Sequence, residues 1–255
     1  MTPRHPYVTV GRTDVLAHRG ASAERPPGNT IPAFTRALEL GADHIETDVQ
    51  ASADGRVVVF HDDRLDGTTT GSGRIDEHPW SHLRSLRYRV DGVAIDDGLV
   101  LLDDVLSRFA DAAFNIDVKT DATVAPVVDV LRRHDARARV CVAAFGWRRL
   151  RRLRRLLGDG WCTAFSRPEI AATRALSWLR LPVIRFGDAV QVPRARRDVT
   201  VVDRRFVDAC HRRDVVVHVW TVNTPAEVTR LRALGVDAVI TDDPATVLPV
   251  LDGPG

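Results

Sequence analysis

The chain has 255 residues, of which 44% are hydrophobic, so it can bury a sizeable core. Its formal net charge of +2 at pH 7 gives no global field that would favour nucleic acid or an anionic membrane as a partner. Its three cysteines are widely spaced within apolar runs, which indicates buried thiols in a reducing compartment and argues against a disulfide framework.

Short apolar runs predict strands, and helical periodicity predicts the elements between them. The expected strands are 14–18, 44–49, 57–60, 114–119, 139–144, 161–165, 188–192, 215–221 and 237–241. The expected helices are 30–40, 102–110, 122–134, 147–157, 168–179, 203–213, 225–234 and 244–251. Strands that alternate with helices are typical of a parallel sheet with right-handed crossovers.

These strands are one too many for an eight-stranded barrel, and the extra strand is 57–60. Only residues 52–56 separate it from the strand before it, which is too short for a helical crossover, and Asp54-Gly55 is a strong hairpin signal. We therefore expect a single (β/α)8 barrel domain over residues 1–255, with a β-hairpin after the second strand. Residues 62–100 form a long insertion before the next helix, and such loops are usually functional.

The hairpin explains why "HIETDVQASADGRVVVFHDD" (44–63) carries charged residues within apolar strands. If Asp54 and Gly55 form a two-residue turn, Asp48 lies opposite His61, and Glu46 lies opposite Asp63. Facing residues share one side of a sheet, and alternation along the strand keeps Glu46 and Asp48 on that side. This acidic side is predicted to look into the barrel mouth.

Three other strand ends carry polar residues. His18 and Arg19 end the first strand, Asp117 and Lys119 lie on one face of "FNIDVKT" (114–120), and the strand "VHVWTVN" (217–223) ends near Trp220. Active sites of barrel enzymes lie at the C-terminal ends of the strands. A structural polar network is the alternative for any one of these residues, but buried charges converging from separate strands are very costly unless paired or bound to a cation.

The residue types favour metal-assisted cleavage of a phosphoester. Glu46, Asp48 and Asp117 offer the oxygen ligands of a hard divalent cation, Mg²⁺ or Ca²⁺, and clustered Cys/His spacing for structural zinc is absent from the sequence. Arg19 and Lys119 suit a phosphate oxyanion, and two nearby histidines suit a general acid and a general base. The ring of a tryptophan at the end of a strand can pack on substrate carbons or in the core, and Trp220 is such a residue.

From about residue 14 to 251 the chain resembles the glycerophosphodiester phosphodiesterases, a branch of the phospholipase-C-like barrels. The matching motifs are "AHRGAS" (17–22), "GNTIPAF" (28–34), "GADHIETDVQ" (41–50), "DGRVVVFHDDRLDGTTTGSGRI" (54–75), "NIDVK" (115–119) and "VHVWTVNTPAEVTRLRALGVDAVITDDP" (217–244). Individually "HRG" is weak, but together and in this order the motifs are specific.

The resemblance implies a role for each of seven residues. These are His18 and His61 as the acid/base pair, Glu46, Asp48 and Asp117 as metal ligands, and Arg19 and Lys119 on the phosphate. It also implies that a hydroxyl of the substrate's own glycerol attacks phosphorus, and that water opens the resulting cyclic phosphate to glycerol 3-phosphate. Residues 62–100 match the family's capping segment over the barrel mouth.

The chain departs from the family pattern at two positions. The family usually has Glu where this chain has Asp117, which is one methylene shorter, and Glu before "NT" where this chain has Gly28. The second change favours, as an alternative, a non-catalytic protein that binds phosphodiesters. Another alternative is an enzyme like lysophospholipase D or sphingomyelinase D, which shares the barrel and the metal but takes a larger acyl substrate.

The sequence also predicts where the protein works and what it meets. Its first 14 residues lack the apolar stretch of a signal peptide, and no apolar run approaches the roughly 20 residues of a spanning helix. We expect a cytoplasmic protein whose partner is a small glycerophosphodiester, with no nucleic acid and no stable membrane insertion. Transient contact with a lipid surface is compatible with this composition.

Overall fold

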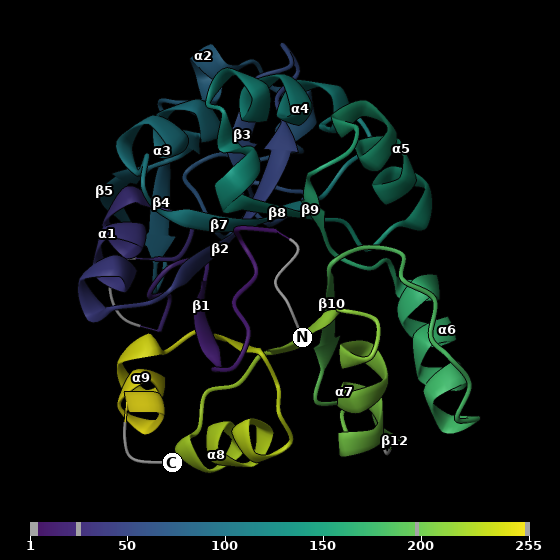
Figure 1. Cartoon of the computed structure of the whole chain (residues 1–255). Coiled ribbons are helices and arrows are strands. Elements are labelled where there is room, and N and C mark those ends of the chain that lie inside the picture. The colour runs from purple at the N-terminus through teal and green to yellow at the C-terminus, as the bar shows by residue number, and fades with distance from the viewer. Residues whose placement is uncertain (1–4, 24–26, 197–198, 253–255) are drawn as a thin grey trace.

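The computed structural model describes residues 5–23, 27–196 and 199–252. Eight parallel strands form the centre of the molecule, and helices surround them (Figure 1). The strands are β1 (Asp14–His18), β2 (His44–Ala51), β7 (Ala113–Val118), β8 (Val140–Ala143), β9 (Cys162–Thr163), β10 (Ala189–Pro193), β13 (Val216–Trp220) and β14 (Ala238–Thr241). The surrounding helices are α1 (Ile31–Leu40), α3 (Leu102–Arg108), α4 (Val124–Arg133), α5 (Trp147–Leu157), α6 (Arg167–Trp178), α7 (Arg204–His211), α8 (Pro225–Ala233) and α9 (Pro244–Asp252).

The strand order confirms the predicted (β/α)8 barrel. The strands pair in the order β10-β13-β14-β1-β2-β7-β8-β9. A single isolated parallel bridge, Ala164 with Ala189, joins β9 to β10 and completes the ring. Each predicted strand and helix has its counterpart, with ends shifted by one or two residues in most cases. The assignment of residues 1–255 to one domain stays a prediction.

Local sequence signals set the first helix and its packing. The Thr30 hydroxyl accepts a hydrogen bond from the Ala33 amide at the start of α1, and Gly41 ends the helix with a φ of 96°. Phe34 on α1 packs with Ile45 of β2 and Phe114 of β7, all fully buried. This packing fixes β2 and β7, the two strands that carry the acidic residues.

The predicted hairpin exists, but its predicted register is wrong by one residue. Strand β3 (Val57–Val59) runs antiparallel to β2, with Val49 opposite Val59. The turn has three residues instead of two, because Gly55 adopts a φ of 76° and the Ser52 amide donates to the Arg56 carbonyl. The residue opposite Asp48 is therefore Phe60, whose amide donates to the Asp48 carbonyl at 3.0 Å.

The insertion 62–100 is more ordered than its sequence indicated. It contains a 3₁₀ helix η1 (Ile75–Glu77), the short helix α2 (Trp80–Leu83), the hairpin of β4 (Arg87–Val90) with β5 (Val93–Gly98), and β6 (Val100–Leu101), which pairs with β3. Outside the insertion, β11 (Ala195–Arg196) pairs antiparallel with β12 (Val199–Thr200). The insertion has a small core of its own, in which Leu65, Leu83 and Tyr88 pack with Phe60.

The N-terminal segment fills the base of the barrel. The ring of Tyr7 stacks on His44 of β2 with ring centroids 4.4 Å apart, and it packs against Cys141 and Cys162. These two cysteines and Cys210 are buried and free, as predicted. No helix in the described ranges is both long and apolar enough to cross a membrane.

Candidate active site

The residues singled out from the sequence converge on one cavity at the C-terminal ends of the strands. The cavity has a volume of about 350 Å³. Its walls include all eight of them: His18, Arg19, Glu46, Asp48, His61, Asp117, Lys119 and Trp220. Asp63, expected opposite Glu46, is exposed and does not line this cavity, because β3 ends at Val59 and residue 63 lies beyond its pairing with β2.

Pairing of β2 with β7 brings the acidic residues together. Asp48 and Asp117 are register partners on these parallel strands, and Glu46 lies one pleat back on the same side. The Lys119 ammonium lies between the two aspartates, with Nζ 2.7 Å from Asp48 Oδ1 and 2.7 Å from Asp117 Oδ2. Arg19 Nε approaches the other Asp48 oxygen at 3.2 Å.

This arrangement pushes the pKa values of the three carboxyl groups apart. Burial would raise the pKa of Asp48, but Lys119 and Arg19 more than offset it and lower that pKa below its usual value. Burial, reinforced by the charge of Asp48, raises the pKa of Glu46 to about 8. Burial also raises the pKa of Asp117, although Lys119 opposes the shift.

The donor set fits a divalent cation, although the side chains are not arranged around one. Across residues 5–23, 27–196 and 199–252, no three His, Cys, Asp or Glu side chains form a ready metal-binding group. Lys119 lies between two of the expected ligands instead. Yet Asp117 Oδ1 is buried without a hydrogen-bond partner, and a raised carboxyl pKa at Glu46 marks a position that a cation would stabilise.

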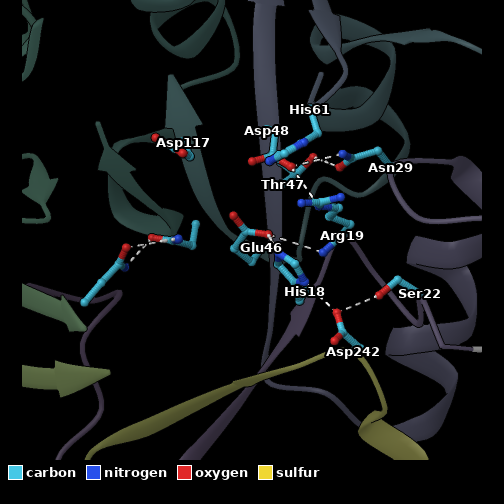
Figure 2. Close-up of polar contacts among 12 residues, drawn as sticks. His18, Arg19, Ser22, Asn29, Glu46, Thr47, Asp48, His61, Asp117 and Asp242 are labelled. Atoms are coloured by element: carbon cyan, nitrogen blue, oxygen red, sulfur yellow. Dashed lines mark hydrogen bonds and ion pairs between the residues drawn. The ribbon is translucent and has the colours of Figure 1, made fainter. Parts of the chain in front are cut away.

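His18 is held by a carboxylate that sequence reasoning missed. Its Nδ1 lies 2.6 Å from Asp242 Oδ1, and its Nε2 lies 3.8 Å from Glu46 Oε2 (Figure 2). Asp242 also accepts hydrogen bonds from Ser22 Oγ at 3.2 Å and Asn223 Nδ2 at 2.8 Å. The hydrogen bond from His18 lowers the pKa of Asp242 to about 2. The only sequence signal for Asp242 was its place just after the last strand, within "ITDDP".

His61 has the same kind of support. Its Nδ1 lies 2.7 Å from Asp62 Oδ1, and the other Asp62 oxygen accepts a hydrogen bond from Thr68 Oγ1 at 2.8 Å. Gln50 Nε2 donates to the His61 carbonyl at 3.1 Å, which fixes the backbone where the chain leaves the hairpin. Each histidine therefore has a carboxylate on Nδ1, which leaves Nε2 to exchange a proton with a substrate.

The "HRG" turn aims Arg19 at Asp48. Arg19 has a φ of 58° and Gly20 a φ of 85°, so the chain reverses directly after β1. A Cβ on Gly20 would lie 2.7 Å from the Ala33 backbone, which explains glycine there. Asn29 donates from Nδ2 to Asp48 Oδ2 at 3.2 Å, a contact that the sequence did not reveal.

Gly28, where the resemblance led us to expect Glu, has close neighbours that leave no room for a side chain. Its φ lies outside the left-handed region, so the constraint is steric. A Cβ there would lie 2.8 Å from the Arg19 Cβ and 3.0 Å from the Ser22 Cβ. A carboxylate at this position would therefore have to displace the Arg19 backbone or side chain in this chain.

Part of the cavity wall is aromatic and apolar. The ring of Trp220 meets the ring of Phe145 edge-on, with centroids 6.1 Å apart. The guanidinium of Arg167 lies 4.8 Å from the Phe145 centroid. Trp220 thus lines the cavity at the end of β13, and its role in substrate binding stays a prediction.

Comparison with known proteins identifies one family. The model of the Glycerophosphoryl diester phosphodiesterase family matches residues 18–246. A "Probable glycerophosphodiester phosphodiesterase 2" of Mycobacterium tuberculosis is 33% identical over 248 residues, which cover 94% of this chain and 91% of the relative. A glycerophosphodiester phosphodiesterase of Caldanaerobacter subterraneus is 29% identical over 251 residues, covering 93% of this chain and 97% of the relative.

Solved structures show the same fold. A putative glycerophosphoryl diester phosphodiesterase from Silicibacter pomeroyi superposes with a TM-score of 0.80 at 22% identity, over 96% of this chain and 95% of that one. A phosphodiesterase of Oleispira antarctica, solved with its product sn-glycerol-3-phosphate, superposes with a TM-score of 0.77 at 24% identity, over 95% and 98% of the two chains. The match to the family model and the relative that is 33% identical show that the chain belongs to the glycerophosphoryl diester phosphodiesterase family.

Proposed function

We propose that this chain hydrolyses glycerophosphodiesters to glycerol 3-phosphate and an alcohol, with His18 and His61 as the acid/base pair. The observation that carries the proposal is the shared cavity, in which two carboxylate-supported histidines lie beside three buried acids and two basic residues. Family membership supports the reaction class, and the product bound to the Oleispira antarctica relative supports the same chemistry.

Glu46, Asp48 and Asp117 would hold a divalent cation, Mg²⁺ or Ca²⁺. When bound, the cation would supply Lewis-acid stabilisation of the charge that develops on the phosphate oxygens. Lys119 would then have to give up at least part of its bridge between Asp48 and Asp117. Its ammonium lies close enough to turn to a substrate phosphate, together with the guanidinium of Arg19.

The chain's own residues account for the proton transfers. One of the two histidines accepts the proton of the attacking glycerol hydroxyl, whose oxygen forms a new bond to phosphorus. The bond from phosphorus to the head-group oxygen breaks, and the other histidine gives that oxygen a proton. Water then attacks the phosphorus of the cyclic phosphate and gives a proton to the histidine that had protonated the head group. The ring bond from phosphorus to the glycerol oxygen that attacked first breaks, and the other histidine returns a proton to that oxygen, so that glycerol 3-phosphate leaves. Trp220 covers the glycerol carbons throughout.

The test is release of glycerol 3-phosphate from glycerophosphocholine, glycerophosphoethanolamine and glycerophosphoinositol. The protein is first stripped with EDTA and then assayed with Mg²⁺ or Ca²⁺. We expect turnover that depends on the added cation. Absence of turnover on every substrate with either metal would refute the proposal. Faster cleavage of lysolipids than of the water-soluble substrates would favour the class that resembles lysophospholipase D.

A further inference from the structure

The insertion contacts one of the two histidines of the candidate active site. Residues 62–100 leave the barrel directly after His61, which lines the cavity (Figure 2). His18 is supported by Asp242 from the loop after β14, whereas the carboxylate on His61 and the hydroxyl of Thr68 that supports this carboxylate both belong to the insertion. The insertion therefore contributes to the geometry of the site itself.

Two hydrogen bonds connect Thr68 with the ring of His61. Thr68 Oγ1 donates to Asp62 Oδ2 at 2.8 Å, and the other oxygen of that carboxylate lies 2.7 Å from His61 Nδ1. Because each carboxylate oxygen has its own partner, the Asp62 side chain cannot turn without losing one of the two bonds. Thr68 thus acts on the orientation of His61 through Asp62.

The backbone around these contacts is fixed from two sides. The amide of Arg89, on β4, donates to the Thr68 carbonyl at 2.9 Å, so Thr68 is tied to the hairpin of the insertion. Gln50 Nε2, on β2, donates to the Asp62 carbonyl at 2.5 Å and to the His61 carbonyl at 3.1 Å. These bonds hold the backbone of all three residues, and the side-chain contacts are left to orient the imidazole.

The ring of His61 depends on this support because packing restrains it little. Its side chain is 39% exposed, compared with 23% for His18. Burial would raise the pKa of Asp62, but the hydrogen bonds with His61 and Thr68 more than offset it and lower that pKa below its usual value. An ionised carboxylate accepts hydrogen bonds and donates none, so it favours a proton on Nδ1 of a neutral imidazole and leaves Nε2 as an acceptor.

We infer that Thr68 and Asp62 are positioning residues, through which the insertion sets the orientation and the tautomer of His61 for proton transfer. The catalytic part of this inference rests on the proposed function. A carboxylate on the far nitrogen of a catalytic histidine holds the ring in the tautomer that the reaction needs, and an amide in its place favours the wrong one. Loss of such a residue lowers kcat and leaves KM unchanged, because only the transition state is affected.

The kinetic test measures kcat and KM for glycerol 3-phosphate release at saturating metal. We expect Asp62→Asn to lower kcat at least about tenfold, part of the roughly 10²–10⁴ that a general acid or base contributes. Thr68→Val should lower kcat about three- to tenfold, the usual effect of one hydrogen bond, and Thr68→Ser, which keeps the hydroxyl, should stay near the wild type. KM should not change in any of the three variants.

Thr70→Val is the matched control. Thr70 Oγ1 accepts a hydrogen bond from the Arg87 amide at 3.0 Å, so the same substitution in the same insertion also loses one hydrogen bond, but not one to Asp62. Its kcat should equal that of the wild type. An equal loss of kcat in Thr70→Val and Thr68→Val would attribute the effect to a loosened insertion and overturn the inference, as would an unchanged kcat in Asp62→Asn.

The tautomer of His61 is a readout that does not depend on turnover. Ring nitrogen chemical shifts of the metal-free protein distinguish a proton on Nδ1 from one on Nε2, and the spectrum of His61→Ala identifies the His61 signals. At about pH 9, where a histidine of ordinary pKa is neutral, the wild type should carry the proton on Nδ1, and Asp62→Asn should move it toward Nε2. A wild-type proton on Nε2 would overturn the inference. A wild type with the Nδ1 tautomer that cleaves no glycerophosphodiester would overturn the proposed function and leave the positioning of His61 standing.

Discussion

Lys119 sets the electrostatics of the cavity while no cation is bound. Its ammonium bridges Asp48 and Asp117, and both aspartates are almost completely buried. From the sequence, repulsion among clustered carboxylates predicts that loss of the Asp48 charge stabilises the metal-free protein. In the structure the two acids differ in their ion pairs. Asp48 contacts both Lys119 and Arg19, whereas the Glu46 carboxylate lies 3.8 Å from the nearest histidine nitrogen, His18 Nε2.

Asp48→Asn should therefore destabilise the metal-free protein. The substitution removes the negative charge that faces Lys119 and Arg19, and we expect a loss of about 1–3 kcal/mol in the free energy of unfolding. It should also abolish the rise in melting temperature that Mg²⁺ or Ca²⁺ gives the wild type. Thermal melts in EDTA and in excess metal measure both effects. An undiminished metal-induced rise would show that Asp48 is not a ligand.

Glu46→Gln is the matched variant, because it mimics the protonated form that burial already favours. Its melting temperature in EDTA at pH 7 should equal or exceed that of the wild type, while its metal-induced rise is also lost. If both variants destabilise the metal-free protein equally, the difference in pairing between the two acids has no energetic consequence.

His61→Ala should fold normally and lose turnover. The His61 side chain is 39% exposed, so its removal creates little cavity, whereas loss of a general acid or base typically costs about 10²–10⁴ in rate. The measurement is kcat for glycerol 3-phosphate release at saturating metal. His82→Ala, which removes an exposed histidine from α2, is the control and should keep full activity. A His61→Ala protein with more than about a tenth of wild-type kcat would remove His61 from the acid/base pair.

At the scale of elements, apolar periodicity was enough to predict the strands and helices of the barrel but not the exact pairing of β2 with β3. Alternation along β2 correctly placed Glu46 and Asp48 on one face. The register depended on whether Gly55 lies in a two- or a three-residue turn, and a dipeptide signal does not distinguish them. The elements of the insertion were missed because they are short and pack on one another rather than following a long periodic pattern.

The start of β1 gives a prediction about pH and stability. Asp14 is only 2% exposed, and burial, with the charge of Asp43, raises its pKa to about 6. The folded protein thus holds this proton more tightly than the unfolded chain, whose Asp has a pKa near 3.8. Asp14 therefore makes its full contribution to the free energy of unfolding below about pH 4. That contribution is lost as the pH rises through about 6.

Asp14→Asn should remove the loss of stability that ionisation of Asp14 causes at higher pH. We expect the variant to be more stable than the wild type by about 2 kcal/mol at pH 8, with the difference shrinking toward zero at pH 4. Urea unfolding at pH 4, 6 and 8 measures the free energy of unfolding of both proteins. Asp96→Asn, at an exposed position in β5, is the control and should show no such trend. A difference that does not vary with pH would contradict the assigned cause.

At the scale of the whole molecule, the barrel joins positions that the sequence keeps far apart. Closure of β1 against β14 places Asp242 on His18, a contact over more than 200 residues. Convergence of the predicted residues followed from the rule that barrel sites lie at the C-terminal strand ends. The contacts of those residues could not be predicted in the same way, because the position of Lys119 between two acids depends on packing across separate strands.

The barrel should open most readily between β9 and β10. Six residue pairs join β2 to β7, whereas the isolated bridge of Ala164 with Ala189 is the described ladder contact between β9 and β10. Two flanking backbone hydrogen bonds support that seam. The Asp188 amide donates to the Thr163 carbonyl at 2.8 Å, and the Phe165 amide donates to the Ala189 carbonyl at 2.9 Å. Fewer cooperative bonds give a lower free energy of local opening, so amides there exchange faster.

Hydrogen exchange followed by mass spectrometry tests this at peptide level. Peptides that span the β9–β10 seam should exchange at least about tenfold faster than peptides from β2 and β7, a difference of about 1.4 kcal/mol in opening free energy. Strands β1 and β14, joined by four residue pairs, provide an internal control and should resemble β2 and β7. Equal protection at the β9–β10 seam and in β2 would mean that the ring is held shut there by the packing of α6 and α7, which contact each other outside it, rather than by the strand ladder.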